Sequence, residues 1–232
     1  MNVDLFVGTL TRYYSEQWEN AATRAGRRSP FGPHKHKGGQ AVTDPVDLQG
    51  VIAQWLEEAT FKLKEHLKEP LAWKEGMLQP HFVGELGMAG YGGAMLLTAY
   101  TGNAHLPRPV TMMKTWEGDP AIDACMKAEK KDALWEVMNC GIWFPVEFSF
   151  GIGMKDPSGQ PIKAGSVDLL WRALLYLNEV NWGASSEQMA AWRERPPGDA
   201  DTFDSQAQFG FAVFHEMCRL ARENRLPIKL HY

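Results

Sequence analysis

The stretch "VDLFVGTLTRYY" (Val3 to Tyr14) decides the fold, because an alternating apolar run gives way within it to polar and aromatic residues. The alternation predicts a strand over Val3–Leu10. The side chains expected on one face are Val3, Leu5 and Val7, and those expected on the other are Phe6 and Leu10. Ser15 is the expected N-cap of a helix that carries Trp18, Ala21 and Ala22. The corner Thr9–Tyr14 therefore joins the first strand to the first helix.

The later chain has few strand patterns and many helical ones. "IWFPVEFSF" (Ile142–Phe150) predicts a second strand of the same sheet, and Pro145 favours an edge position or a bulge there. Helical patterns follow Asp44-Pro45, the glycine run before Tyr91, Asp119-Pro120, Ser166, and Ser185 with its capping-box partner Gln188, and the last one covers Phe203–Asn224. "PIKLHY" predicts a closing strand. Helices and strands do not alternate strictly, so we expect one α+β domain over residues 1–232, helix-rich with a small mixed or antiparallel sheet.

The composition excludes several classes of protein. The formal charge is −4, whereas a dedicated nucleic-acid binder usually carries a basic surplus. The three cysteines form no C-x-x-C pair, so we expect free thiols and a reducing compartment. No apolar run is long enough to span a bilayer, and the N-terminus lacks the pattern of a secretory signal. We therefore expect a cytoplasmic protein without membrane contact, metal or cofactor.

One segment is basic. The stretch from about residue 25 to residue 44 is rich in glycine and proline and contains His34 and His36. The five cations in and beside it are Arg24, Arg27, Arg28, Lys35 and Lys37. We interpret the segment as an exposed loop, since a designed metal site would need further ligands.

Two other segments resemble known motifs but lack the residues that those motifs require. His215-Glu216 would need a second histidine four residues after the first to bind zinc on a helix, and Arg219 stands there. "GELGMAGYGG" has Met95 where a dinucleotide loop needs its third glycine, and no lysine follows it to bind phosphate. The simpler interpretation of this run is a tight turn that lets a helix pack closely on a strand.

The candidate site residues lie at three places. Arg12 and at least one of Tyr13 and Tyr14 are expected to line a cleft beside Glu85 and Tyr91, where Arg12 pairs with Glu85 or holds an anionic group of a ligand. The alternative is that the tyrosines only fix the corner in place. A third candidate lies on the second strand. Glu147, near Trp143, is either a general base with a raised pKa or part of a solvent-facing edge.

Two passages, "VDLFVGTLTRYYSEQWE" and "GELGMAGYGGAMLLTAY", resemble a group of uncharacterised bacterial proteins. Together with "WFPVEF" and the capped "LLWRALLYLNEV" helix, they are also similar to the immunity proteins of bacterial toxin systems. Those are compact, acidic, Trp-rich cytoplasmic proteins that bind a toxin, and this chain has nine tryptophans. The resemblance implies a protein partner and no catalytic residue.

Two functions therefore remain open. The first is protein–protein binding, with an immunity-type toxin inhibitor as its specific form. The second is a small-molecule-binding protein or enzyme with its site at the Thr9–Tyr14 corner near Glu85 and Tyr91. A deep pocket lined by these residues would favour the second.

Overall fold

The computed structural model describes residues 3–19, 44–111, 116–129, 132–149, 151–198 and 202–232. Within them, six strands form one mixed sheet in the order β2-β1-β6-β3-β5-β4. The strands are β1 (Asp4–Val7), β2 (Phe82–Glu85), β3 (Ile142–Phe144), β4 (Ile152–Lys155), β5 (Pro161–Ser166) and β6 (Ile228–His231). The β3–β5 pair is parallel, and the other neighbouring pairs are antiparallel.

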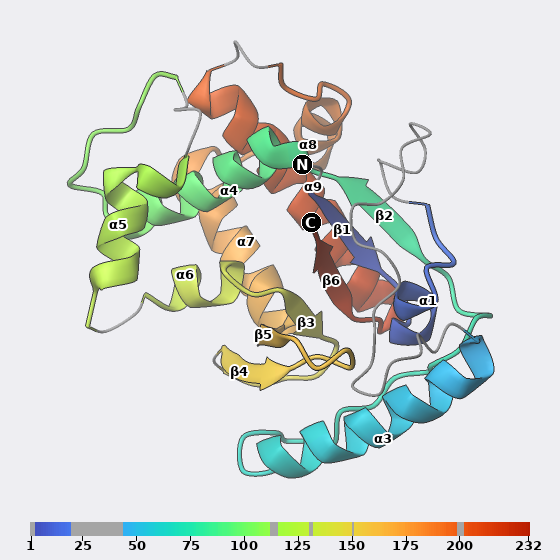
Figure 1. Ribbon diagram of the computed structural model, residues 1–232. Helices are drawn as coiled ribbons and strands as arrows, with labels where there is room; N and C mark the ends of the chain where they lie inside the picture. The colour runs from blue at the N-terminus through green and yellow to red at the C-terminus, as the bar shows by residue number, and fades with distance from the viewer. Residues whose placement is uncertain (1–2, 20–43, 112–115, 130–131, 150, 199–201) are drawn as a thin grey trace.

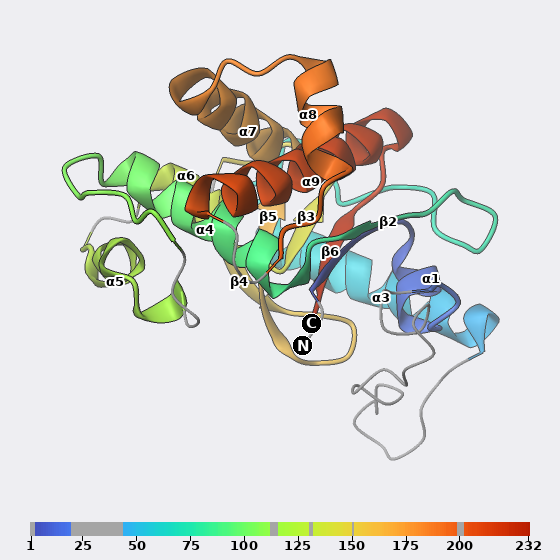
Figure 2. The same ribbon diagram turned by 90° about the horizontal axis from the view of Figure 1, so that it is seen from above.

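Helices cover both faces of this sheet (Figures 1 and 2). The α-helices of the described residues are α1 (Leu10–Tyr14), α3 (Pro45–Leu63), α4 (Gly87–Gly102), α5 (Pro120–Lys127), α6 (Ala133–Met138), α7 (Val167–Asn181), α8 (Ser186–Arg193) and α9 (Phe203–Asn224). One buried cluster joins the sheet to α4, α6, α7 and α9, and a second joins its other face to α1 and α3. The predicted α+β class is confirmed. The expected basic loop lies outside the described residues except for Asp44.

The alternation in the first strand is confirmed. Val3, Leu5 and Val7 belong to the cluster under α4 and α9, whereas Phe6 belongs to the cluster under α1 and α3. Leu10 belongs to the second cluster too, but it is the first residue of α1 and not part of the strand. β1 and β3 lie in the same sheet, as predicted, with β6 between them. A strand buried on both faces fixes its register strongly, because a slip by one residue would exchange its two sets of side chains.

The first helix begins earlier than the sequence predicts. Thr9, not Ser15, is the N-cap of α1, and its hydroxyl accepts the backbone N–H of Arg12. Ser15 ends this helix, and Trp18 lies outside any helix. The remaining part of the expected helix, with Ala21 and Ala22, lies outside the described residues. The predicted N-cap was wrong because the strand ends at Val7 instead of Leu10, so the helix can begin earlier. Threonine caps a helix as well as serine does, and Thr9 is the residue at that position.

The second strand is shorter and more central than predicted. β3 ends at Phe144, directly before Pro145, which has no N–H to continue the ladder. It lies between β5 and β6, so the predicted edge position is wrong. The edge next to β5 is formed by β4, which the sequence analysis did not predict.

The other helix starts follow the sequence. Asp44, Asp119, Ser166 and Ser185 each accept a backbone N–H of the first turn, and Ser185 completes the predicted capping box with Gln188. The stretch predicted as one helix from Asp119 is divided into α5 and α6. No helix in the described part of the chain is both long and apolar enough to cross a membrane.

The glycine run is part of α4, not a turn before it. Gly87, at φ 59°, is the first residue of this helix, and Gly90 and Gly93 lie inside it. They face α9, where a Cβ on Gly210 would lie 1.9 Å from the carbonyl oxygen of Gly90. The glycines therefore allow close helix packing, as predicted, but against a helix instead of a strand.

Candidate functional site

The candidate site is a gap in the sheet where β3 has not yet begun. Ile142, the first residue of β3, pairs with Lys229 of β6 and with Ala164 of β5. Gly141 still bonds to both neighbouring strands, accepting from Leu230 N and donating to Lys163 O. Before Gly141 the chain leaves the sheet for α6, while β5 and β6 continue. The two strands are then separated by open space instead of a third strand.

A cavity of about 380 Å³ occupies this gap, which we call the strand-gap pocket. It is lined by Tyr13, Asn139, Cys140, Gly141, Asp156, Ser158, Gln160, Pro161, Ile162, Lys163, Lys229, Leu230, His231 and Tyr232. These residues come from α1, the segment before β3, the turn between β4 and β5, β5 itself and the C-terminal end of the chain. Segments that are distant in sequence therefore supply one set of polar groups.

Lys229 is the least expected of these groups. Its side chain lies on the face of the sheet that α1 covers, and the residue is only 9% exposed. The ammonium Nζ donates a hydrogen bond of 3.2 Å to Leu230 O and lies 5.4 Å from the centre of the Tyr13 ring. No acidic oxygen of the described residues lies within 4.0 Å of it. Burial lowers the pKa of Lys229 to about 8, although the negative charge of Asp156 acts in the opposite direction.

The two tyrosines of α1 are tied to this pocket by hydrogen bonds. The hydroxyl of Tyr13 lies 3.0 Å from Nδ1 of His231, and the hydroxyl of Tyr14 donates to Oδ2 of Asp156 over 2.8 Å. Burial, followed by the charge of Asp156, raises the pKa of both tyrosines well above the ordinary value. Both hydroxyls therefore stay protonated at neutral pH.

Asp156 organises the turn between β4 and β5. Its Oδ1 accepts from the backbone N–H and hydroxyl of Ser158 and from the backbone N–H of Gln160, at 2.6 to 3.0 Å. This is the Asx-turn chemistry of a carboxylate that holds its own loop. Since Oδ2 is held by Tyr14, the same carboxylate fixes the turn to α1.

The structure does not bring Arg12 and Glu85 together. Arg12 donates hydrogen bonds to the carbonyl oxygens of Met77 and Gln17, and it forms no ion pair with Glu85 in the described part of the chain. Glu85 pairs with Asp4 at the far end of β1 from this corner. Arg12 thus connects α1 to the loop before β2, which is the structural role that the sequence left open.

Tyr91 reaches the site only through a neighbour. Its ring lies 6.3 Å from that of Tyr232 in an edge-on arrangement, and the two hydroxyls interact. Tyr232 lines the strand-gap pocket, whereas Tyr91 is buried behind it in α4. Burial raises the pKa of Tyr91 well above its ordinary value.

Glu147 is a surface residue on the segment that follows β3. Its carboxylate lies 2.9 Å from Nζ of Lys68 and 2.9 Å from a guanidinium nitrogen of Arg172. Hydrogen bonds from Lys68 and then Arg172 lower its pKa, which is the opposite of the shift expected for a general base. The structure corrects that interpretation, because the strand ends before Glu147 and leaves it exposed.

Glu75 is a residue of this corner that the sequence analysis missed. Its two oxygens accept from the backbone N–H groups of Leu10 and Thr11, from the Thr11 hydroxyl and from Nε1 of Trp73, at 2.5 to 3.0 Å. It therefore satisfies the free N–H groups at the start of α1. No local signal marks it, because it reaches α1 from the loop before β2.

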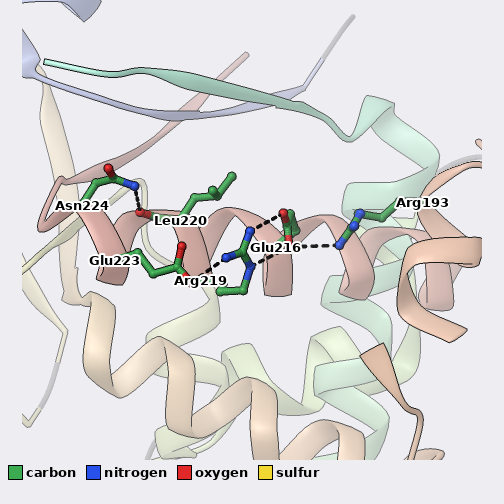
Figure 3. Close-up of polar contacts among 6 residues, drawn as sticks. All are labelled: Arg193, Glu216, Arg219, Leu220, Glu223 and Asn224. Carbon is green, nitrogen blue, oxygen red and sulfur yellow. Dashed lines mark hydrogen bonds and ion pairs between the residues drawn. The ribbon is translucent and has the colours of Figure 1, made fainter. Parts of the chain in front are cut away.

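The segment around His215-Glu216 carries an ion-pair network (Figure 3). Glu216 accepts from Arg219 at 2.8 and 3.0 Å and from Arg193 of α8 at 3.1 Å, and Arg219 also reaches Glu223. The ring of His215 lies tilted against that of Trp171, with ring centres 4.7 Å apart. The described residues contain no group of three histidine, cysteine or acidic side chains placed to hold a metal ion. All three cysteines are buried, and none forms a disulfide in the part of the chain that the structure describes.

A larger hollow of about 910 Å³ lies between α3 and the β4–β5 hairpin. It shares Asp156, Pro161, Ile162 and Lys163 with the strand-gap pocket, and Leu63 and Met154 add further apolar lining. The charged residues Glu58, Lys62 and Lys155 at its rim are exposed. Exposed charges are solvated at little cost. The buried ionisable groups therefore single out the smaller cavity as the candidate site.

Comparison of the chain with models of protein families, with curated proteins and with solved structures gave no match. The functional argument therefore depends on the geometry of the site.

Proposed function

We propose that this chain is a small-molecule-binding protein whose ligand occupies the strand-gap pocket. The observation that carries the proposal is Lys229, whose buried ammonium has no acidic oxygen within 4.0 Å among the described residues. Burying an unpaired cation costs folding free energy. Polar groups that weaken the fold without an evident structural role are typical of functional sites.

The dimensions of the pocket support the same proposal. Its volume of about 380 Å³ lies within the range of about 300–1,000 Å³ that is usual for small-ligand sites. Ile162, Pro161 and Leu230 supply apolar surface, while Tyr13 and Lys229 supply polar groups. Such a lining suits a small molecule with an apolar body and a polar end.

A thermal-shift screen of small organic acids, aldehydes and ketones tests the proposal. A compound that binds in the pocket should raise the melting temperature of the wild type and of Lys62→Met, a variant at an exposed lysine of α3. The same compound should have little effect on Lys229→Met. A compound that stabilises all three proteins equally binds outside the pocket. If the screen finds only such compounds, the proposal is contradicted.

Protein binding is a second candidate function, and the outer face of α7 supports it. Leu175, Tyr176 and Val180 are 47%, 51% and 52% exposed, although all three are apolar or aromatic. Exposed apolar patches are typical of interaction surfaces. An immunity-type role in a bacterial cytoplasm is the specific form of this candidate. The absence of disulfides among the three cysteines, all of which lie in the described residues, supports a reducing compartment.

The second candidate has its own test. The wild-type protein and Tyr176→Glu are used as baits in parallel pull-down experiments. A partner that docks on α7 should be retained by the wild type and lost from Tyr176→Glu. A partner retained equally by both baits would contradict docking at this face.

A further inference from the structure

Lys229 is placed to act as an amine and not only as a cation. We propose that the ε-amino group of Lys229 forms an imine with a small aldehyde or ketone bound in the strand-gap pocket. This inference rests on the proposed function and names the chemical class of the ligand.

The position of Nζ is the first argument. Its hydrogen-bond acceptor, Leu230 O, and the aromatic ring that it faces, that of Tyr13, both belong to residues that line the pocket. Lys229 lines the pocket as well. An ammonium has three N–H donors, and a single bond to a neighbouring carbonyl uses one of them. The amine is thus held at the cavity wall, and it forms no ion pair with any of the described residues.

The surroundings of Nζ are the second argument. The adjacent strands contribute Phe6 and Ile142, which are apolar and fully buried. The ionisable groups around it are Tyr13 and Tyr14 of α1, Asp156 of the hairpin turn, His231 of the same strand, Tyr232, Cys140, and Lys163 paired with Glu136 at 2.6 Å. Of these charges, Asp156 stabilises the ammonium, but burial outweighs it and brings the pKa of Lys229 to about 8. A substantial fraction of neutral amine is therefore present near neutral pH.

The reaction needs no oxidant or other co-reactant. The nitrogen lone pair attacks the carbonyl carbon, a C–N bond forms, and the electrons of the C=O π bond move to oxygen, which takes up a proton. The nitrogen loses a proton, and the hydroxyl is then protonated and leaves as water while the C=N bond forms, which gives a protonated imine. Loss of the remaining N–H proton gives the neutral imine. The products are the imine and one water molecule.

Proton transfer to the departing oxygen can be served by groups of the same pocket. The hydroxyl of Tyr13 and Nδ1 of His231 are 3.0 Å apart and form a hydrogen-bonded pair in the pocket lining. A general acid must lie within hydrogen-bond reach of the oxygen that it protonates. We assign the proton transfer to the pair of Tyr13 and His231. The ring of Tyr13 also positions the amine, which lies over its face.

Reductive trapping tests the inference on the full chain. Butanal, which carries no acidic group, is added with sodium cyanoborohydride, and peptide mass spectrometry measures the rate of alkylation at each lysine. At about pH 7, we expect Lys229 to be labelled about tenfold faster than the exposed Lys62, because its lower pKa leaves more of the neutral amine. The ratio should fall as the pH approaches about 10, and unfolding in urea should abolish it.

The controls separate this inference from the proposed function. Lys229→Arg keeps a cation that forms no stable imine, so the fast label should vanish while the remaining lysines react as before. Labelling of Lys229 no faster than that of Lys62 in the native protein would overturn the inference. If small acids still stabilise the wild type but not Lys229→Met in the thermal-shift screen, the pocket binds anions, and only the imine chemistry is wrong.

Discussion

Tyr14 donates a hydrogen bond of 2.8 Å to Asp156, a residue 142 positions later in the chain. The bond joins α1 to the turn between β4 and β5, and these two elements form part of the wall of the strand-gap pocket. One contact thus fixes the helix that follows β1 against the turn of the β4–β5 hairpin, on the other side of β6 and β3 in the sheet.

Tyr14→Phe should destabilise the fold by about 1–3 kcal/mol, because Oδ2 of the buried Asp156 loses its donor. Urea unfolding measures the change. Tyr176→Phe is the matched control, since Tyr176 is half exposed, and it should be nearly neutral. Equal effects of the two substitutions would show that the Tyr14 bond does not stabilise the corner.

Arg12→Ala should lower the melting temperature and leave ligand binding intact. The guanidinium bonds two backbone carbonyls, and their loss costs about 1–3 kcal/mol. Thermal unfolding and calorimetry with any ligand found for the pocket measure the two quantities separately. Loss of binding with an unchanged melting temperature would instead place Arg12 in the site.

Glu75→Gln should destabilise the protein more than the same substitution at an exposed glutamate does. The carboxylate accepts three hydrogen bonds from the start of α1 and a fourth from Nε1 of Trp73, whereas an amide offers one acceptor oxygen and a competing donor. We expect a loss of about 2–3 kcal/mol. Glu57→Gln, at an exposed position of α3, is the control in the same unfolding experiment. A loss no larger than that of this control would refute the capping role.

Lys229→Met should stabilise the fold at neutral pH, and the gain should shrink as the pH rises. The pKa of Lys229 falls from 10.5 in the unfolded chain to about 8 in the folded one. Between these values the unfolded chain binds more protons, so the stability of the wild type increases with pH. The advantage of the variant is therefore largest below about pH 8, at up to about 3 kcal/mol.

Urea unfolding of both proteins at about pH 7 and about pH 9.5 measures this change. Lys62→Met, at an exposed position of α3, is the control measured in parallel. A constant difference between wild type and Lys229→Met across the range would mean that Lys229 is not buried as a cation.

Gly210→Ala should be strongly destabilising. The added Cβ would lie 1.9 Å from the carbonyl oxygen of Gly90, so α4 and α9 would have to separate. We expect a loss of at least about 3 kcal/mol. Gly50→Ala is the opposite control, because nothing lies within 4 Å of its Cβ in α3, and alanine there should stabilise by up to about 1 kcal/mol. Similar effects at both sites would show that the two helices do not pack through glycine.

The sequence predicts those features that depend on neighbouring residues. The caps at Asp44, Ser166 and Ser185 and the two faces of β1 are encoded within a few positions, and the structure confirms them. β4 was missed because Gly153 and Lys155 interrupt its apolar pattern, and within the described residues it pairs with β5 alone.

The site is less predictable, because its members meet through the tertiary fold. Tyr13 and Tyr14 were found from their position after a strand. Lys229 alternates with Ile228 and Leu230, which is equally typical of a strand with one solvent-facing side. Lys229 is buried because β6 lies in the middle of the sheet, between β1 and β3, which the pattern of β6 itself does not reveal.

The position at which β3 begins has a mechanical consequence. The antiparallel unit β2-β1-β6 and the hairpin β4–β5 are joined within the sheet by a strand of three residues, and the register of that strand with β6 comprises two residue pairs. A force that pulls these two parts of the sheet apart would therefore load very few backbone hydrogen bonds. A molecule bound beside Gly141 would touch both parts at once, and its affinity would add directly to the resistance of this seam to shear.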